Sequence, residues 1–340
     1  MGILNNAYHE VALMTAPKQR KVIDRVFTRA PALQAVPTFP TTDGWETVYE
    51  IELQADSMEI VNLDEKLPII NSNTDLRRVQ IGIMGGKMLI PKDKARALGG
   101  AAAAFTKKLP SVLKQTGMNM ERAIFEKTFL PAVKNHAATT TNAPDARHED
   151  HSDFFKKISG GVADGVAGEW ILAVRWEEGV VSGLYNPDGY GNKNMFNPTP
   201  ISGGNMYTLG EEAGPLKGVE GFGQILESNF GILLADPDYV SGMYAGDLTE
   251  TATDGEIVYT AIPLKGDLQR MIHLIEGSSA DTIFYCSPGM FSAMKSAYGT
   301  YMGEVVYTSP VGNIEFTFQT FDGIPFITSY NFKKVAYNNI

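Results

Sequence analysis

The sequence predicts an α+β fold, because stretches of strand and stretches of helix follow one another along the chain. Three observations predict it. Apolar and polar residues alternate over 46–54, helical spacing with an alanine run fills 91–137, and apolar strands separated by glycine turns dominate 169–245. The chain has 340 residues and is 44% hydrophobic, so it can bury a sizeable core.

The composition excludes several classes of protein. A formal net charge of −10, without a basic run, argues against direct sequence-specific binding of DNA or RNA. The single cysteine, Cys286, excludes a disulfide framework and suits assembly in the cytosol. The sequence has no uninterrupted apolar stretch of membrane-spanning length, and its first residues lack the pattern of a signal peptide.

Residues 1–43 are expected to form an arm. Pro31, Pro37 and Pro40 favour an extended path, and an arm rich in proline cannot bury much within its own domain. We therefore expect the arm to lie on another surface. Before these prolines, helical spacing predicts a short amphipathic helix with the apolar residues Val22, Ile23, Val26 and Phe27.

Two strands joined by a long connection are expected next. Alternation predicts a half-buried strand over 46–54 and a second strand over 79–84, separated by a largely polar stretch. In the first strand Tyr49, Ile51 and Leu53 share one face. Because connections of this length are uncommon inside a compact domain, the extended two-stranded loop is expected to be functional.

Helices are predicted over 91–137. The first begins at Pro91 and contains the alanine run 101–104, and Pro110 is expected to end it. A second helix follows, with a buried side made of Met120, Ile124, Phe125 and Leu130. Residues 138–168 are polar and rich in glycine, which indicates a mobile connection.

The tryptophans indicate a sheet core. Trp170 and Trp176 are six residues apart, so on a regular strand they face the same side as Leu172 and Val174. A second strand is predicted over 180–185, followed by further strands at 222–226 and 229–234.

The C-terminal part alternates between helix and strand. Residues 262–277 predict a helix, 282–288 a buried strand, 289–299 a second helix and 314–330 a hairpin whose turn is Asp322–Gly323. The buried face of the first helix is expected to contain Leu264, Leu268, Met271, Ile272 and Ile275.

Few residues are candidates for a catalytic or metal-binding site. His148 and His151, with Glu149 and Asp150 between them, could hold a divalent ion, but they lie in a polar connection where a solvated loop is the better interpretation. Cys286 lies in an apolar strand and is expected to act as a small hydrophobe. We therefore expect no catalytic, cofactor-binding or metal-binding residue, and no cofactor.

The order of the predicted strands and helices along the chain resembles that of a known protein family. The segments VIDRVFTRAPALQAVPTFP, MERAIFEKTFLPAV, WILAVRWEEGVVSGLYNPDG, GFGQILESNFGILLADPDYV, DTIFYCSPGMFSAM and FDGIPFITSY resemble parts of the HK97-like major capsid proteins of tailed double-stranded DNA bacteriophages. The resemblance implies an HK97-like α+β fold with these parts: an N-terminal arm (1–43), an extended loop (44–90), a spine helix and first part of a peripheral domain (91–168), an axial domain (169–255), and a helix, strand and closing hairpin shared by the two domains (256–340).

The function implied by the resemblance is structural. Such a protein self-assembles as hexamers and pentamers into the icosahedral head, which encloses double-stranded DNA without sequence-specific binding. It is a virion protein assembled in the host cytoplasm, and it is not an enzyme. The expected partners are a separate scaffolding protein, since no long helical segment precedes the arm, a portal protein and possible decoration proteins. Some members cross-link a loop lysine to an asparagine, but the spacing of Lys66 and Asn331, Asn338 or Asn339 indicates no such bond.

Three alternatives stay open. An encapsulin-like compartment shell would have the same fold, and a tail-tube protein would form tubes instead of shells. A metal-assisted α+β enzyme would have its site between the helical part and the 169–245 sheet, through His148 and His151. For a shell protein, removing residues 1–30 is expected to leave a folded subunit that cannot close shells.

Overall fold

The computed structural model describes residues 29–55, 69, 72–139, 151–158, 167–187, 196–246, 250–253, 256–259, 262–308 and 315–340. The predicted helix at 22–27, Lys66 and His148 lie outside the described residues. In the described part, no helix combines the length and the apolar character needed to cross a membrane.

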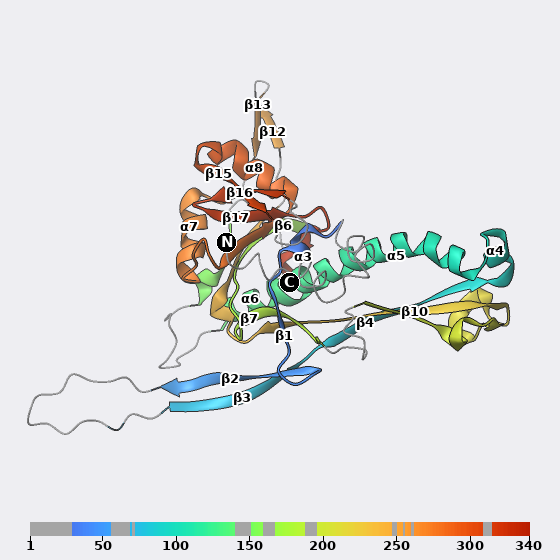
Figure 1. The fold of residues 1–340 in the computed structure, drawn as a ribbon. Coiled ribbons are helices and arrows are strands. Elements are labelled where there is room, and N and C mark those ends of the chain that lie inside the picture. Colours follow the sequence, from blue (N-terminus) through green and yellow to red (C-terminus); the bar gives the residue numbers. More distant parts are fainter. Residues whose placement is uncertain are drawn as a thin grey trace, which may run out of the picture.

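An eight-stranded sheet forms the centre of the body (Figure 1). Its order is β15-β16-β17-β14-β6-β11-β5, and β18 pairs with β6. The strands are β5 (Phe155–Lys157), β6 (Ala167–Arg175), β11 (Val240–Ala245), β14 (Thr282–Cys286), β15 (Met302–Thr308), β16 (Glu315–Phe321), β17 (Ile324–Thr328) and β18 (Val335–Ala336).

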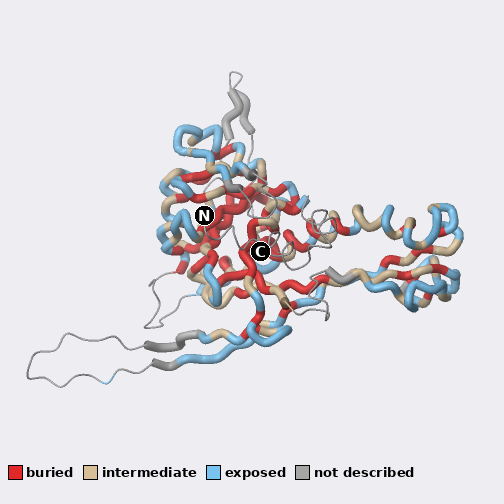
Figure 2. The backbone as a smooth tube through the Cα atoms, in the orientation of Figure 1, coloured by how far each residue is buried: buried red, intermediate tan, exposed pale blue. Residues whose placement is uncertain are grey.

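Helices cover both faces of this sheet, and the core has two parts. We call the continuous helical stretch 101–137 the spine. On one face of the sheet, its residues Phe125 and Phe129 pack against Trp170 and Tyr285. On the other face, Leu268 joins a second buried cluster with strand residues. Figure 2 shows the buried residues concentrated in this body. The helices are α4 (Lys92–Ala97), α5 (Ala101–Ile124), the π-helical turn η3 (Phe125–Phe129), α6 (Leu130–Ala137), α7 (Lys265–Leu274) and α8 (Pro288–Tyr298).

The tryptophan prediction is confirmed. Trp170, Leu172, Val174 and Trp176 all belong to the same buried cluster, on the face of β6 that meets the spine. The indole Nε1 of Trp176 donates a hydrogen bond to the hydroxyl of Tyr285 at 3.1 Å. This strand is therefore part of the hydrophobic core of the subunit.

A second, six-stranded sheet continues beside the spine helix. Its order is β1-β7-β10-β4, and β8 and β9 also pair with β10. Residues 222–226 and 229–234, predicted as two strands, belong to the single strand β10, which is 15 residues long. In Figure 1, β10 and β4 run along α5. The strands are β1 (Thr38–Pro40), β4 (Gly82–Pro91), β7 (Val181–Tyr185), β8 (Phe196–Pro200), β9 (Tyr207–Thr208) and β10 (Glu220–Leu234).

Two predictions about these helices are wrong: that one helix runs from Pro91 through the alanine run, and that Pro110 ends it. Pro110 lies inside α5 and does not end it. Proline removes one backbone donor, but α5 contacts β4 and β10, and this packing supports the helix across the missing bond. The break falls instead at Gly99 and Gly100, whose φ values of 88° and 105° are accessible to glycine and costly for other residues. The predicted buried residues Met120, Ile124, Phe125 and Leu130 are confirmed.

The described part of the arm also differs from its prediction. Residues 31–34 form the one-turn helix α3 (Pro31–Gln34) instead of an extended path, and Leu33 and Val36 are fully buried in the subunit's own core. Proline at the first position of a helix has a favourable φ and needs no hydrogen-bond partner for its nitrogen. The expectation that the arm buries little within its own domain is therefore wrong for residues 30–36.

Three further segments can be compared with their predictions. Residues 151–158, expected in a mobile connection, form η4 (Ser152–Phe154) and β5, and Phe154 is fully buried. Leu264, expected on the buried face of α7, is 67% exposed because it caps the helix instead of lying within it. The terminal hairpin is confirmed, with Asp322 and Gly323 at φ values of 52° and 80° between β16 and β17.

Candidate assembly surfaces

The extended hairpin consists of β2 (Glu46–Ala55) and β3 (Ser72–Gln80). These strands pair antiparallel with each other and with no other described strand. The predicted second strand at 79–84 is displaced, because residues from Gly82 onward form β4 and pair with β10. In Figure 1 the hairpin leaves the body and points away from it.

Among the hairpin residues whose burial the structure describes, 46–50 and 74–80, packing against the subunit's own core lies at the base. Tyr49 and Val79 contact a small buried cluster of Ile81, Leu184 and Leu233. The two strands form a sheet of their own, and isolated two-stranded ribbons are only marginally stable in water. A surface that covers the ribbon would therefore stabilise it.

One face of the extended hairpin carries two exposed apolar side chains. Leu76 is 70% exposed and Val48 is 37% exposed. Leu76 pairs with Glu50 and Val48 with Arg78, and cross-strand partners lie on the same face, so this face combines two apolar side chains with charged ones. Exposed apolar surface rimmed by charge is typical of a contact site for another protein.

A second open surface lies along the spine. We call it the spine groove, a cavity of about 650 Å³ between α5, β4 and β10. Met84 and Met88 of β4, Leu113 of α5 and Leu226 of β10 contribute apolar lining, while Arg122 and Lys127 contribute charge. A groove of this size can accept several side chains of a neighbouring protein.

The arm joins the body at a buried carboxylate, which we call the arm hub: Glu121, Ala32 and Asn331. Glu121 of α5 is fully buried and accepts a hydrogen bond from the backbone N–H of Ala32 at 2.9 Å. The side-chain amide of Asn331 donates to the same carboxyl and to the carbonyl oxygen of Arg29. Three segments far apart in sequence therefore meet on one acidic side chain.

The surroundings of Glu121 raise its pKa. Burial raises the pKa of Glu121 from 4.5 to about 7, although hydrogen bonds from Asn331, Ala32 and Ser329 act in the opposite direction. Glu121 was not among the residues predicted from the sequence. The helical spacing could have indicated its burial, because Glu121 follows Leu113 and Gly117 at intervals of four and so lies on the buried face of the helix.

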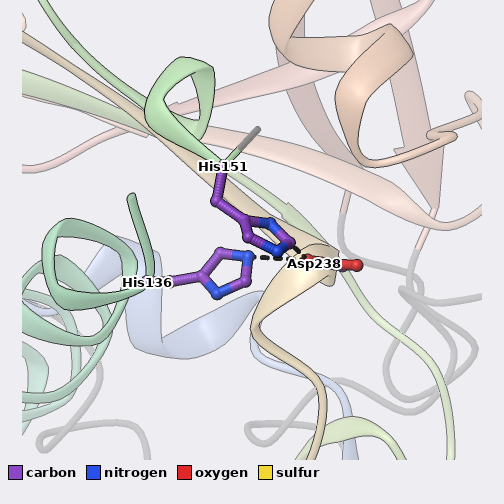
Figure 3. Close-up of side chains that lie close together, drawn as sticks. All are labelled: His136, His151 and Asp238. Atoms are coloured by element: carbon purple, nitrogen blue, oxygen red, sulfur yellow. Dashed lines mark hydrogen bonds and ion pairs between the residues drawn. The ribbon is translucent and has the colours of Figure 1, made fainter. Parts of the chain in front are cut away.

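The solvated loop expected for the candidate pair His148 and His151 is wrong for His151, which is 4% exposed. His148 lies outside the described residues, whereas His151 is buried and lies next to His136 and Asp238 (Figure 3). Neither His136 nor Asp238 was identified from the sequence, because they are distant from His151 along the chain. Cys286, in contrast, is a buried free cysteine as predicted, and burial raises the pKa of its thiol.

The fold has relatives among solved structures, although no protein-family model and no curated protein matches the sequence. A chain in the structure of bacteriophage Epsilon15 is similar with a TM-score of 0.51 and 13% identity, over 88% of this chain and 86% of that chain. The capsid of bacteriophage JBD30 is similar with a TM-score of 0.45 and 9% identity, over 89% of this chain and 91% of that chain. The likeness to the Epsilon15 chain confirms the predicted α+β fold of HK97-like type.

Proposed function

We propose that this chain is the major capsid protein of a tailed bacteriophage. In this role it assembles as hexamers and pentamers into the icosahedral head that encloses double-stranded DNA. The observation that carries the proposal is the fold, which is similar to a bacteriophage Epsilon15 chain over 88% of the present chain. The role is structural, and it assigns no catalytic residue.

The extended hairpin supports assembly with copies of the same chain. Its outer face exposes Leu76 and Val48, and the subunit itself covers only the base. The spine groove offers a second, partly apolar surface. When two different patches of identical subunits bind each other, the contact is head-to-tail. Such contacts form a closed ring if the rotation that relates neighbouring subunits is a whole fraction of a full turn.

The charge suits a container for DNA. A formal net charge of −10 disfavours adhesion to the phosphate backbone, so the enclosed DNA is held by the closed shell and not by specific contacts. The remaining partners of this role are a separate scaffolding protein, a portal protein and decoration proteins. The protein would then reside in the virion after assembly in the host cytoplasm.

Electron microscopy tests the proposal. The purified chain, expressed alone and then with the neighbouring reading frames of its source, is examined by negative stain and by size-exclusion chromatography with light scattering. Closed shells or rings of six and five subunits are expected. Incorporation of a co-expressed portal protein into the shells would favour a phage head over an encapsulin-like compartment. A uniform monomer or dimer under both conditions would contradict the proposal.

A further inference from the structure

Three side chains from distant parts of the chain converge at the end of α6, and we call them the histidine cluster: His136, His151 and Asp238. His136 lies in the last turn of α6. His151 directly precedes η4, and Asp238 lies in the short helix η8 (Pro237–Tyr239), just before β11. Figure 3 shows both imidazole rings turned toward the carboxylate.

The distances suit a shared ion. The Nε2 atom of His136 lies 2.6 Å from Oδ1 of Asp238, and the Nδ1 atom of His151 lies 3.6 Å from the same oxygen. All three ligand atoms lie within 4.8 Å of one another. Tetrahedral Zn²⁺ with bonds of about 2.0–2.1 Å separates its ligand atoms by about 3.3 Å. A small rotation of the Asp238 carboxylate would therefore make room for the ion.

The histidine cluster is sheltered from water. The side chain of His151 is 4% exposed, and those of His136 and Asp238 are 13% and 12% exposed. Phe154 packs against both rings, with centroid distances of 5.0 Å to His136 and 5.8 Å to His151. An apolar shell of this kind limits competition from solvent and strengthens electrostatic attraction between a cation and its ligands.

The backbone at Asp238 is held in place by its own turn. The backbone N–H of Asp238 donates a hydrogen bond of 2.9 Å to the side chain of Asp236, which caps η8. The two imidazole rings are 4.2 Å apart between centroids. The ligands are thus positioned by three separate elements before any ion binds, and positioning of this kind reduces the entropy lost on binding.

We propose that His136, His151 and Asp238 bind one Zn²⁺ ion, with water in the fourth position. Two imidazole nitrogens and one carboxylate oxygen are ligands that Zn²⁺ prefers, and Mg²⁺ or Ca²⁺ would require more oxygen ligands. The ion ties the end of the spine to the segments before β5 and β11. The site departs from the sequence-based expectation that the chain has no metal ligand, and it does not depend on the proposed function.

Metal titration of the full chain tests the site. Protein without a polyhistidine tag is freed of metal with a chelator, and ZnCl₂ is added in an isothermal titration calorimeter. CoCl₂ serves as a spectroscopic probe, because tetrahedral Co²⁺ absorbs visible light. We expect one ion per chain, a higher unfolding temperature with Zn²⁺, and a loss of affinity of at least about tenfold in His136→Ala and in His151→Ala.

Controls keep the result interpretable. Asp238→Asn preserves the shape of the side chain while removing its charge, so it tests the carboxylate if an alanine variant fails to fold. His273→Ala removes an exposed histidine of α7 and is expected to bind Zn²⁺ like the unaltered protein. Absence of Zn²⁺ binding, or binding that all three cluster variants retain, would overturn the proposal. Stability that changes with pH but not with Zn²⁺ would do the same, because it would identify a hydrogen-bonded cluster.

Discussion

At the residue scale, Glu121 links the stability of the subunit to pH. Its pKa is raised from 4.5 to about 7 in the folded protein, chiefly by burial, so the folded state binds this proton more tightly than the unfolded chain. The contribution to stability is fully present below pH 4.5 and is lost as the pH rises through about 7. A shift of this size corresponds to roughly 3 kcal/mol at most.

Glu121→Gln is expected to flatten this dependence. The amide keeps an oxygen that can accept from the backbone N–H of Ala32, but it does not titrate. Between about pH 5 and about pH 8, the free energy of unfolding of the unaltered protein should fall more steeply than that of the variant. Urea denaturation at several pH values measures both slopes. The exposed residue Glu178 provides a control, since Glu178→Gln should leave the slope unchanged, and equal slopes for Glu121→Gln would refute the prediction.

A second residue-scale prediction concerns Ser287. Its hydroxyl caps α8 by accepting a hydrogen bond from the backbone N–H of Met290 at 3.1 Å. Ser287→Ala should lower the free energy of unfolding by about 1 kcal/mol, the usual contribution of a serine cap. Ser292 lies exposed within the same helix, so Ser292→Ala serves as a matched control and should have little effect. Denaturant titration compares the two variants.

At the scale of elements, the extended hairpin and the spine serve different purposes. The spine supplies the core with buried aromatic side chains, whereas the residues of β2 and β3 whose burial is described contribute to the core at the base of the hairpin. An element that the subunit covers so little can change without loss of folding. If the chain assembles as proposed, mutations in the hairpin are expected to separate folding from assembly.

Leu76→Asp is expected to prevent shell formation while leaving the subunit folded. Leu76 is 70% exposed, so a charge there costs little in the isolated subunit, but it would be buried without a partner in a contact between subunits. Leu264→Asp is the matched control, because Leu264 is 67% exposed and lies outside the hairpin. Circular dichroism measures folding and electron microscopy measures assembly. Normal shells from Leu76→Asp would show that this face makes no essential contact.

At the scale of the whole molecule, the described start of the arm belongs to the folded subunit. Residues 30–36 belong to the core of their own subunit, and the arm hub fastens them to α5 and to the C-terminal segment. A truncation that is meant to impair assembly without unfolding the subunit must therefore stop before these residues. Truncations that stop before residue 29 leave the hub intact, and longer ones remove part of the core.

Two truncations test this boundary. Removal of residues 1–28 should leave the unfolding temperature almost unchanged and abolish closed shells. Removal of residues 1–36 should lower the unfolding temperature by several degrees or prevent folding, because it deletes the buried side chains Leu33 and Val36 together with a partner of Glu121. Thermal unfolding and electron microscopy provide the two measurements. Closed shells from the shorter truncation would contradict a role of the arm in assembly.

The sequence by itself determined the features that depend on neighbours along the chain. Alternation identified the inward face of Trp170 and Trp176, apolar continuity identified β14, and Asp322–Gly323 identified the terminal turn. The tertiary structure alone decided that β4 pairs with β10, that Glu121 holds Ala32 and Asn331, and that His136 and His151 meet Asp238. The physical reason is that periodicity reports which side of an element is buried, while the identity of the partner depends on how distant segments pack.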